Sequence, residues 1–254
     1  MSGHSKWAQI KRQKGANDAK RGQLFTKLGR EITVAARDGG GDPNANFRLR
    51  LAIQRARENN MPMENIERAI KRGAGGGEGS SLEEITYEGY GAGGAAILVE
   101  AMTDNRNRAA ADIRSVFTRG GGSLGESGCV AWLFDSKGVI TVDVGKNDAE
   151  EVALLAIDAG ADDFKIEDGS LDVYTAPGDL ERVRRALESR KLAITGAEIS
   201  MIPKTTVELD SKATAQVLKL IERLEDLDDV QRVYTNVEVS EEALAEYSAL
   251  GDKR

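Results

Sequence analysis

The hydrophobic and polar positions follow a helical period near the start of the chain. On a wheel of 100° per residue, six apolar residues share about one third of the circumference. Four basic residues occupy the neighbouring arc, and Asn17 or Asp18 can cap the start of the helix. This pattern predicts a helix with one packing face and one cationic stripe, ended by the run of glycine, aspartate and proline at 39–43. The apolar face comprises Leu24, Phe25, Leu28, Ile32, Ala35 and Ala36, and the stripe comprises Lys20, Lys27, Arg30 and Arg37.

Two further amphipathic segments follow. The pattern predicts one helix over about residues 46–58 and another that begins at Pro62 and stops at Gly73. Residues 1–15 show no apolar periodicity, so we expect a mobile arm before a three-helix unit. Residues 73–81 are rich in glycine and predict a linker.

After the linker the period changes to that of strands. Residues 85–89 and 95–102 predict strands, and Thr103 or Asp104 is expected to cap a helix over 105–118 that stops at residues 120–122. Residues 129–134 predict another strand. Beyond Pro203, residues 205–208, 212–224 and 230–239 predict a strand, a helix and a strand. These supply what the block 85–134 lacks, so we expect the two blocks to form one discontinuous domain.

Between these blocks lies a self-contained β-α-β-β-α-β order. Its predicted elements are a strand over 139–144, a helix over 148–159, a hairpin over 163–167 and 171–175, a helix over 178–192 and a strand over 197–201. This is the order of a ferredoxin-like fold. The predicted fold class is therefore α+β, with an N-terminal three-helix domain and two α/β domains, one ferredoxin-like and inserted into the other. The predicted domains are 1–80, 81–134 plus 204–254, and 135–203.

Charge is distributed unevenly along this pattern. Residues 1–72 hold 16 Lys and Arg against 7 Asp and Glu, whereas the other 182 residues hold 19 against 35. The net charge is thus +9 at one end and −16 elsewhere, within a chain of −7. Such asymmetry is typical of a segment that binds a polyanion.

The sequence argues against a membrane protein, a secreted protein and a zinc protein. The longest fully apolar run, 152–157, is far shorter than the ~20 residues of a membrane span, and no apolar region follows the basic start as in a secretory signal. One cysteine, Cys129, inside an apolar segment, fits a small core residue in a reducing compartment. With His4 as the sole histidine, no common zinc ligand set can form. We expect no cofactor, no metal and a cytoplasmic protein.

Two strings look enzymatic but stand in the wrong context. The glycines of residues 89–94 fit a dinucleotide-binding pattern, but they join two predicted strands rather than a strand and a helix. Residues 121–125 fit a nucleophile elbow around Ser123, but they follow a helix, and only His4 could serve as its base. We therefore expect no enzymatic activity.

The basic end is the strongest candidate site. Trp7 lies in the arm, where no core period requires it, and an indole can stack on a base. Glycines at positions 15 and 22 let the backbone follow an irregular phosphate path. The candidate nucleic-acid-binding residues are Lys6, Trp7, Lys11, Arg12, Lys14, Lys20, Arg21, Lys27 and Arg30.

A second candidate surface lies at the start of the helix over 105–118, together with the glycine-rich loop 119–128 beside it. Cations at a helix start oppose the helix dipole, and an anionic partner could offset that cost. Asp104 is equally well explained as a helix cap. The residues of this surface are Asp104, Asn105, Arg106, Asn107, Arg108 and Arg119.

The motifs of the chain resemble those of the YebC/PmpR family. They are the opening residues 1–7, 18–22 (DAKRG), 25–28 (FTKL), 64–70 (ENIERAI), 87–90 (YEGY), 103–108 (TDNRNR) and 233–237 (VYTNV). The resemblance covers essentially the whole chain. It implies a three-domain cytoplasmic regulator of gene expression without enzymatic activity. Family members are described as probable DNA-binding transcriptional regulators, and relatives look like ribosome-associated translation factors that relieve stalling.

The residues favour RNA slightly over DNA as the partner. We find no clear helix-turn-helix whose recognition helix carries base-reading side chains. Basic groups spread over an arm and an amphipathic helix suit the backbone of a structured RNA such as ribosomal RNA or tRNA. An acidic body is also repelled by duplex DNA. DNA remains open as a partner, and the alternative function is a protein-interaction module whose α/β domains bind a partner.

Overall fold

A computed structural model describes residues 18–75, 82–145, 147–167, 169–240, 242–245 and 247. The arm predicted over residues 1–15 and most of the predicted linker lie outside these ranges. Residue contacts group the chain into two compact units. The first unit comprises Met1–Leu133 with Pro203–Arg254, and the second comprises Phe134–Ile202.

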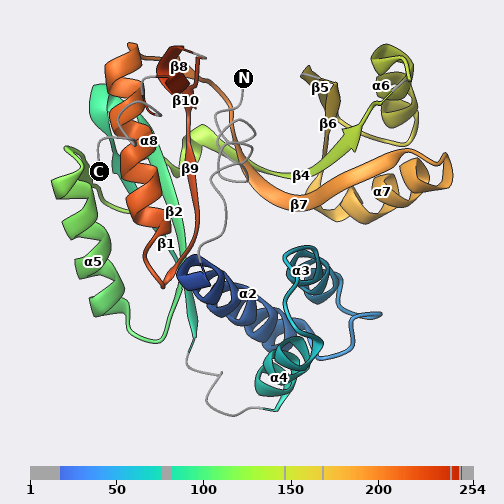
Figure 1. The fold of residues 1–254 in the computed structure, drawn as a ribbon, viewed down its shortest axis with the longest axis horizontal. Coiled ribbons are helices and arrows are strands. Elements are labelled where there is room, and N and C mark those ends of the chain that lie inside the picture. Colours follow the sequence, from blue (N-terminus) through green and yellow to red (C-terminus); the bar gives the residue numbers. More distant parts are fainter. Residues whose placement is uncertain are drawn as a thin grey trace. The chain divides into compact units, whose positions relative to one another are not determined.

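From residue 18 onward, the described part of the first unit starts with three helices, as the sequence predicts. They are α2 (Asp18–Gly39), α3 (Phe47–Glu58) and α4 (Met63–Ala74) (Figure 1). Their shared core includes Ile32, Leu49 and Ile66, each fully buried. Burying one such side chain contributes about 1.5–3 kcal/mol, so the apolar stripe of each helix determines this packing.

Gly73 does not stop α4, contrary to the prediction. The helix continues to Ala74 with Gly75 as its C-cap, and Gly73 is buried within it. A Cβ at this position would lie 2.2 Å from the Thr33 carbonyl oxygen of α2. Glycine is needed here because the two helices cross in backbone contact.

The rest of the first unit is a four-stranded sheet with the order β3-β1-β2-β9. Two helices share its main core with the sheet, which confirms that the tail and the middle block form one fold (Figure 1). The strands are β1 (Glu83–Tyr90), β2 (Ala96–Thr103), β3 (Ser123–Leu124) and β9 (Val230–Thr235), and the helices are α5 (Arg106–Arg119) and α8 (Ser211–Glu225). Short 3-10 turns lie at Ala92–Gly94 and Ala131–Leu133, and β8 (Val207–Glu208) pairs in parallel with β10 (Val237–Glu238).

Three local predictions in this region were wrong. Of residues 129–134, only Phe134 lies in a strand: a turn and the 3-10 segment Ala131–Leu133 precede β4 (Phe134–Asp143). Cys129 is therefore a half-buried turn residue rather than a core strand residue. The cap of α5 is Asn105, whose side chain accepts a hydrogen bond from the Arg108 N–H. The strand predicted over 230–239 is interrupted at Asn236, whose side chain instead accepts from the Ala96 N–H.

The second unit has the predicted ferredoxin-like topology. Its strands lie side by side in the order β5-β6-β4-β7. If the four strands are numbered 1 to 4 along this unit, the order is 2-3-1-4, which is that of a ferredoxin-like fold. The elements are β4 (Phe134–Asp143), α6 (Ala149–Asp158), β5 (Asp163–Glu167), β6 (Ser170–Thr175), a 3-10 turn (Pro177–Asp179), α7 (Leu180–Ser189) and β7 (Ala193–Pro203).

The fold is thus α+β, with the ferredoxin-like part inserted into the other α/β part. The three domain boundaries given above remain a prediction. No helix in the described ranges is long and apolar enough to cross a membrane.

Candidate nucleic-acid interface

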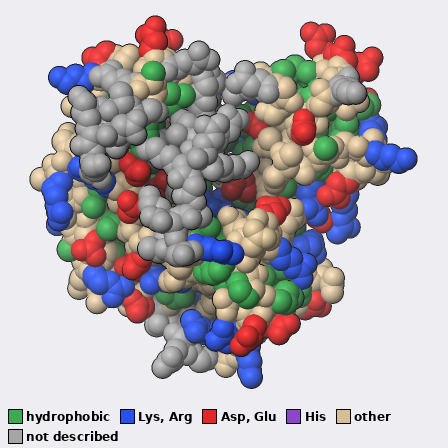
Figure 2. Space-filling view, in the orientation of Figure 1, with side chains coloured by type: hydrophobic (Ala, Val, Ile, Leu, Met, Phe, Trp, Pro, Cys, Tyr) green, Lys and Arg blue, Asp and Glu red, His purple; other side chains and the backbone are tan. Residues whose placement is uncertain are grey.

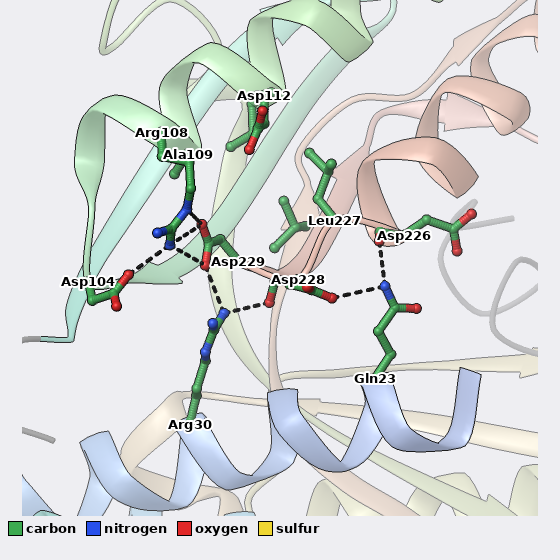
Figure 3. Close-up of a pocket in the computed structure, with 12 residues that line it drawn as sticks. Gln23, Arg30, Asp104, Arg108, Ala109, Asp112, Asp226, Leu227, Asp228 and Asp229 are labelled. Carbon is green, nitrogen blue, oxygen red and sulfur yellow. Dashed lines mark hydrogen bonds and ion pairs between the residues drawn. The ribbon is translucent and has the colours of Figure 1, made fainter. Parts of the chain in front are cut away.

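The polar face of α2 contacts a turn about 200 residues away in the chain. Gln23 Nε2 donates to the Asp226 carbonyl (2.8 Å) and to Asp228 Oδ1 (2.9 Å). Lys27 Nζ donates to the Glu225 carbonyl at 2.5 Å, and Arg30 donates to the Asp228 carbonyl at 2.6 Å. Half of the predicted cationic stripe, Lys27 and Arg30, thus binds the acidic 225–229 turn of the same molecule. Figure 3 shows the contacts of Gln23 and Arg30.

Asp229 is the centre of this contact. Its side chain is 10% exposed and accepts from Arg30 Nη1 (2.9 Å), Arg108 Nη2 (3.0 Å) and Thr103 Oγ1 (3.1 Å). The three donors come from α2, α5 and the end of β2. One carboxylate therefore joins the helices of the N-terminal part to the split sheet (Figure 3).

A cavity of about 450 Å³ opens beside Asp229. Arg30 and Arg108 line it, but so do five aspartates: Asp104, Asp112, Asp226, Asp228 and Asp229. Because carboxylates outnumber the guanidinium groups, the cavity does not favour a phosphate. In the part of the chain that the structure describes, no cluster of three or more His, Cys, Asp or Glu is arranged to hold a metal.

A second set of ion pairs extends the same contact. Glu31 on α2 accepts from Arg55 of α3 (3.2 Å) and from Arg232 of β9 (3.1 Å). Burial by itself would raise the pKa of Glu31, but the charges of Arg55, Arg232 and Arg48 outweigh it and hold the pKa below its ordinary value. Glu31 is thus an anion shared between the helices and the sheet.

Sequence reasoning did not identify Glu31, Asp229 or Arg232. A usable signal was present, because four of the five residues at 225–229 are acidic and complement the cationic stripe of α2. The two segments are about 200 residues apart in the chain, so the sequence pattern did not show that they are in contact.

Two arginines of the second candidate surface also pair with acidic residues of the same molecule. Arg108 pairs with Asp104 at 2.7 Å as well as with Asp229, and Arg106 lies 3.5 Å from Glu83. The hydrogen bond from Arg108 lowers the pKa of Asp104. Asn105 caps the helix, and Asn107 is exposed.

Arg119 is not part of that cluster, so the predicted position of the loop beside it was wrong. Arg106 and Arg119 begin and end α5, and 13 steps of about 1.5 Å separate them by about 20 Å. Arg119 hydrogen-bonds Ser115 on its own helix.

The first candidate surface is described only in part. Arg21 is exposed, and its guanidinium lies 5.7 Å from the centre of the Phe25 ring. Lys20 belongs to α2. Lys27 and Arg30 have the internal partners given above. Lys6, Trp7, Lys11, Arg12 and Lys14 lie outside the described residues.

Other exposed cations of the helical part alternate with acidic residues. Arg57, Arg68, Lys71 and Arg72 are exposed on α3 and α4, where Glu58, Glu64 and Glu67 are also exposed. Figure 2 shows Lys and Arg interspersed with Asp and Glu over the lower part of the molecule. The described surface of α3 and α4 therefore presents both signs of charge.

Comparison with known proteins identifies the family. Residues 5–76 match the model of the TACO1/YebC protein N-terminal domain, and residues 82–237 match that of the TACO1/YebC second and third domain. A protein of Moorella thermoacetica named "probable transcriptional regulatory protein" is 61% identical over 242 residues, covering 94% of this chain and 96% of the relative. One from Dehalococcoides mccartyi with the same description is 54% identical over 247 residues, covering 97% and 98%.

A solved structure shares the fold. The crystal structure of a conserved hypothetical protein from Aquifex aeolicus has a TM-score of 0.80 and 49% identity, and the match covers 88% of this chain and 93% of that one. With both family models matched and more than half of the positions identical to curated relatives over nearly the full length, the chain belongs to the TACO1/YebC family.

Proposed function

We propose that this protein is a non-enzymatic regulator of gene expression that binds nucleic acid through its basic N-terminal end. One observation carries the proposal: residues 1–21 hold six Lys and Arg and a single Asp in a chain of net charge −7. Neutralising phosphates with such a segment releases counterions and drives binding. The names of the relatives, which are regulatory, support the same role.

The interface that we propose consists of Lys6, Trp7, Lys11, Arg12, Lys14, Lys20 and Arg21. Lys27 donates to the Glu225 backbone carbonyl and Arg30 pairs with the Asp229 carboxylate, so we assign both to holding α2 on the sheet. Arg106 pairs with Glu83, and Arg108 pairs with both Asp104 and Asp229, so we assign Asp104, Arg106 and Arg108 to structure as well.

RNA is the partner that the geometry favours. Helices α3 and α4 are joined by the four-residue turn 59–62, a connection like that of a helix-turn-helix. In such motifs the first turns of the second helix meet the bases. Those turns of α4 expose Glu64 and Glu67, which duplex phosphates would repel. A structured RNA approached by the arm avoids this repulsion.

We further propose that this RNA belongs to the ribosome, so that the protein acts in the cytoplasm as a translation factor. A transcriptional regulator bound to DNA is the competing form of the same proposal. The position of Ser123 on the short strand β3 after α5, rather than on a turn between a strand and a helix, agrees with a non-enzymatic role.

A second candidate function is protein interaction through the ferredoxin-like unit. Four large apolar side chains are exposed on α6 and on β5, an edge strand of the sheet: Leu154, Ile157, Phe164 and Ile166. Such residues are typical of interaction surfaces.

The test is sedimentation of the tagged protein from lysate, with and without RNase or DNase. The test variant changes Lys11, Arg12, Lys20 and Arg21 to Glu. The matched control changes the exposed Arg114, Arg190, Lys212 and Arg223 to Glu, which alters the net charge equally.

Co-migration with ribosomal subunits that RNase and the test variant abolish, and the control variant keeps, supports the RNA form. Absence from ribosomal fractions with salt-sensitive retention on DNA supports the transcriptional form. If the test variant behaves like the wild type in both assays, the basic end is not the interface.

A further inference from the structure

Two exposed aromatic side chains are anchored to one carbonyl oxygen in the first unit. Tyr90 Oη donates to the Cys129 carbonyl at 3.0 Å, and Trp132 Nε1 donates to the same oxygen at 3.1 Å. Their polar tips therefore lie within about 6 Å of each other. Trp132 is 65% exposed and Tyr90 is 38% exposed, so much of both rings faces solvent.

A buried carboxylate positions this pair. Glu88, 4% exposed, accepts hydrogen bonds from the backbone N–H groups of Gly128 (2.6 Å), Val130 (2.7 Å) and Ala131 (2.7 Å). Burial would raise the pKa of Glu88, but the three N–H groups outweigh it and lower the pKa, so the group is an anion at neutral pH. These bonds fix the backbone on both sides of the Cys129 carbonyl.

The turn is also tightly packed. Gly128 has φ of +89°, and a Cβ at Gly125 would lie 2.6 Å from Cys129 Sγ. Lys204 Nζ donates to the Trp132 carbonyl at 3.0 Å, which places a cation beside the tryptophan. The rings are thus held before any ligand arrives, which lowers the entropy cost of binding.

The surroundings favour a planar ligand over an apolar protein surface. Among the described residues of the first unit, the other large hydrophobic side chain that is comparably exposed is Met63, in the helical part. An exposed indole without an apolar patch around it offers its ring to a single planar ligand such as an unpaired nucleobase.

We propose that Trp132 and Tyr90 form a stacking platform for an unpaired nucleobase of the bound nucleic acid. The platform rests on the proposed function, because the basic end would supply most of the affinity. Trp132 would contact the base, whereas Glu88 would act as a positioning residue through the turn.

The experiment measures binding of the full chain to labelled hairpins by fluorescence anisotropy. One RNA hairpin carries a loop of unpaired bases, a second carries the same loop without bases, and a DNA hairpin of the first sequence distinguishes the two sources of the base. Affinities are compared in the wild-type background. For the emission measurement alone, a Trp7→Phe background leaves Trp132 as the sole tryptophan, whose emission reports stacking.

The test variant is Trp132→Leu, and the matched control is Phe164→Leu, which removes an aromatic ring of similar exposure to Tyr90 from the other unit. We expect Trp132→Leu to weaken binding of the base-bearing hairpin by about tenfold and to leave the base-free hairpin and the salt dependence unchanged. Tyr90→Phe keeps the ring without its anchor and should give a smaller loss. The control should bind like the wild type, and the base-bearing hairpin should quench Trp132.

The platform is ruled out if the wild type binds both RNA hairpins equally and Trp132 emission does not change. That result leaves the proposed function intact, whereas failure to bind any hairpin contradicts the proposed function itself. Loss of ribosome co-sedimentation by Trp132→Leu with unchanged hairpin binding also overturns the platform and indicates a protein partner.

Discussion

Two buried carboxylates organise the first unit in different ways. Asp229 is satisfied by side chains, namely two arginines and a threonine that come from three separate elements. Glu88 is satisfied by backbone N–H groups of a single turn about 40 residues further along the chain. Asp229 therefore connects large parts of the fold, whereas Glu88 fixes the shape of one surface turn.

The difference shows how to distinguish side chains whose polar groups bind other parts of the molecule from side chains that can still bind a ligand. Arg30 and Lys27 form part of a cationic stripe in the sequence, yet their partners lie within the molecule. Around Glu88, the polar groups of Tyr90 and Trp132 are satisfied while their ring faces remain open. A side chain is available to a ligand only through the atoms that the fold leaves unsatisfied or exposed.

The largest effect is expected from removing Asp229. Asp229→Ala leaves Arg30 and Arg108 without their shared anion. Because both arginines remain partly exposed, we expect a loss of about 3 kcal/mol, the lower end of the cost of breaking a buried pair. Urea unfolding followed by circular dichroism measures the loss. Asp228→Ala, at the exposed neighbouring residue, should cost less than about 1 kcal/mol. Equal losses for the two variants would contradict the central role of Asp229.

Removal of Glu88 should have a smaller and more local effect. Glu88→Ala leaves three N–H groups unpaired, and we expect a loss of about 2–3 kcal/mol because water can reach part of the turn. Amide hydrogen exchange at Val130 and Ala131 should accelerate. Glu126→Ala, at an exposed residue of the same turn, serves as the control and should change neither quantity.

Neutralising the internal cations tests whether they also bind nucleic acid. The double variant Lys27→Gln and Arg30→Gln should lose about 1–2 kcal/mol of stability and keep the salt dependence of RNA binding. The double variant Lys11→Gln and Arg21→Gln should keep its stability and lower the log–log salt slope by about 1.4–1.8. A lower salt slope of RNA binding for the first variant would show that Lys27 and Arg30 also contact the nucleic acid.

Glu31 makes the stability of the same contact depend on pH, because its pKa differs between the folded and unfolded states. Its pKa is lowered in the folded protein, so its contribution is present above the ordinary glutamate value of 4.5 and is lost as the pH falls through the folded-state value. Glu31→Gln should therefore be less stable than the wild type at pH 7, and the two should converge in acid. Urea midpoints across this range would reveal a constant difference if the assignment were wrong.

Glu100, close to the same Arg232, should give the smallest effect. Burial raises its pKa despite the nearby Arg232 and the hydrogen bond from Tyr234, so the ionised form is disfavoured in the folded state. At pH 7 Glu100→Gln should leave stability unchanged or increase it, because the substitution removes a charge that burial disfavours. A loss as large as that of Glu31→Gln would show that both carboxylates act as structural anions.

Local patterns predicted most of the elements because helices and strands bury one face at a fixed period. The cap of α5 was misassigned by one or two residues, since Thr103, Asp104 and Asn105 are all capable caps and only Asn105 reaches the Arg108 N–H. Residues 129–134 have the composition of a strand, but the N–H groups of Val130 and Ala131, together with that of Gly128, bond to Glu88 instead of to a neighbouring strand. The composition of a segment does not show that its N–H groups bond to an acceptor about 40 residues away rather than to a neighbouring strand.

The sequence alone was sufficient to predict the helical and ferredoxin-like elements. It also showed the concentration of positive charge at one end and the family motifs. Each of these features depends on residues that are close together in the chain. The tertiary structure alone decided that Gly73 lies in a helix crossing, that Lys27 and Arg30 bind the 225–229 turn, and that Trp132 is anchored with its ring exposed. These features depend on backbone approach and on pairs separated by up to about 200 residues, which only folding brings within the few ångströms that hydrogen bonds and ion pairs require.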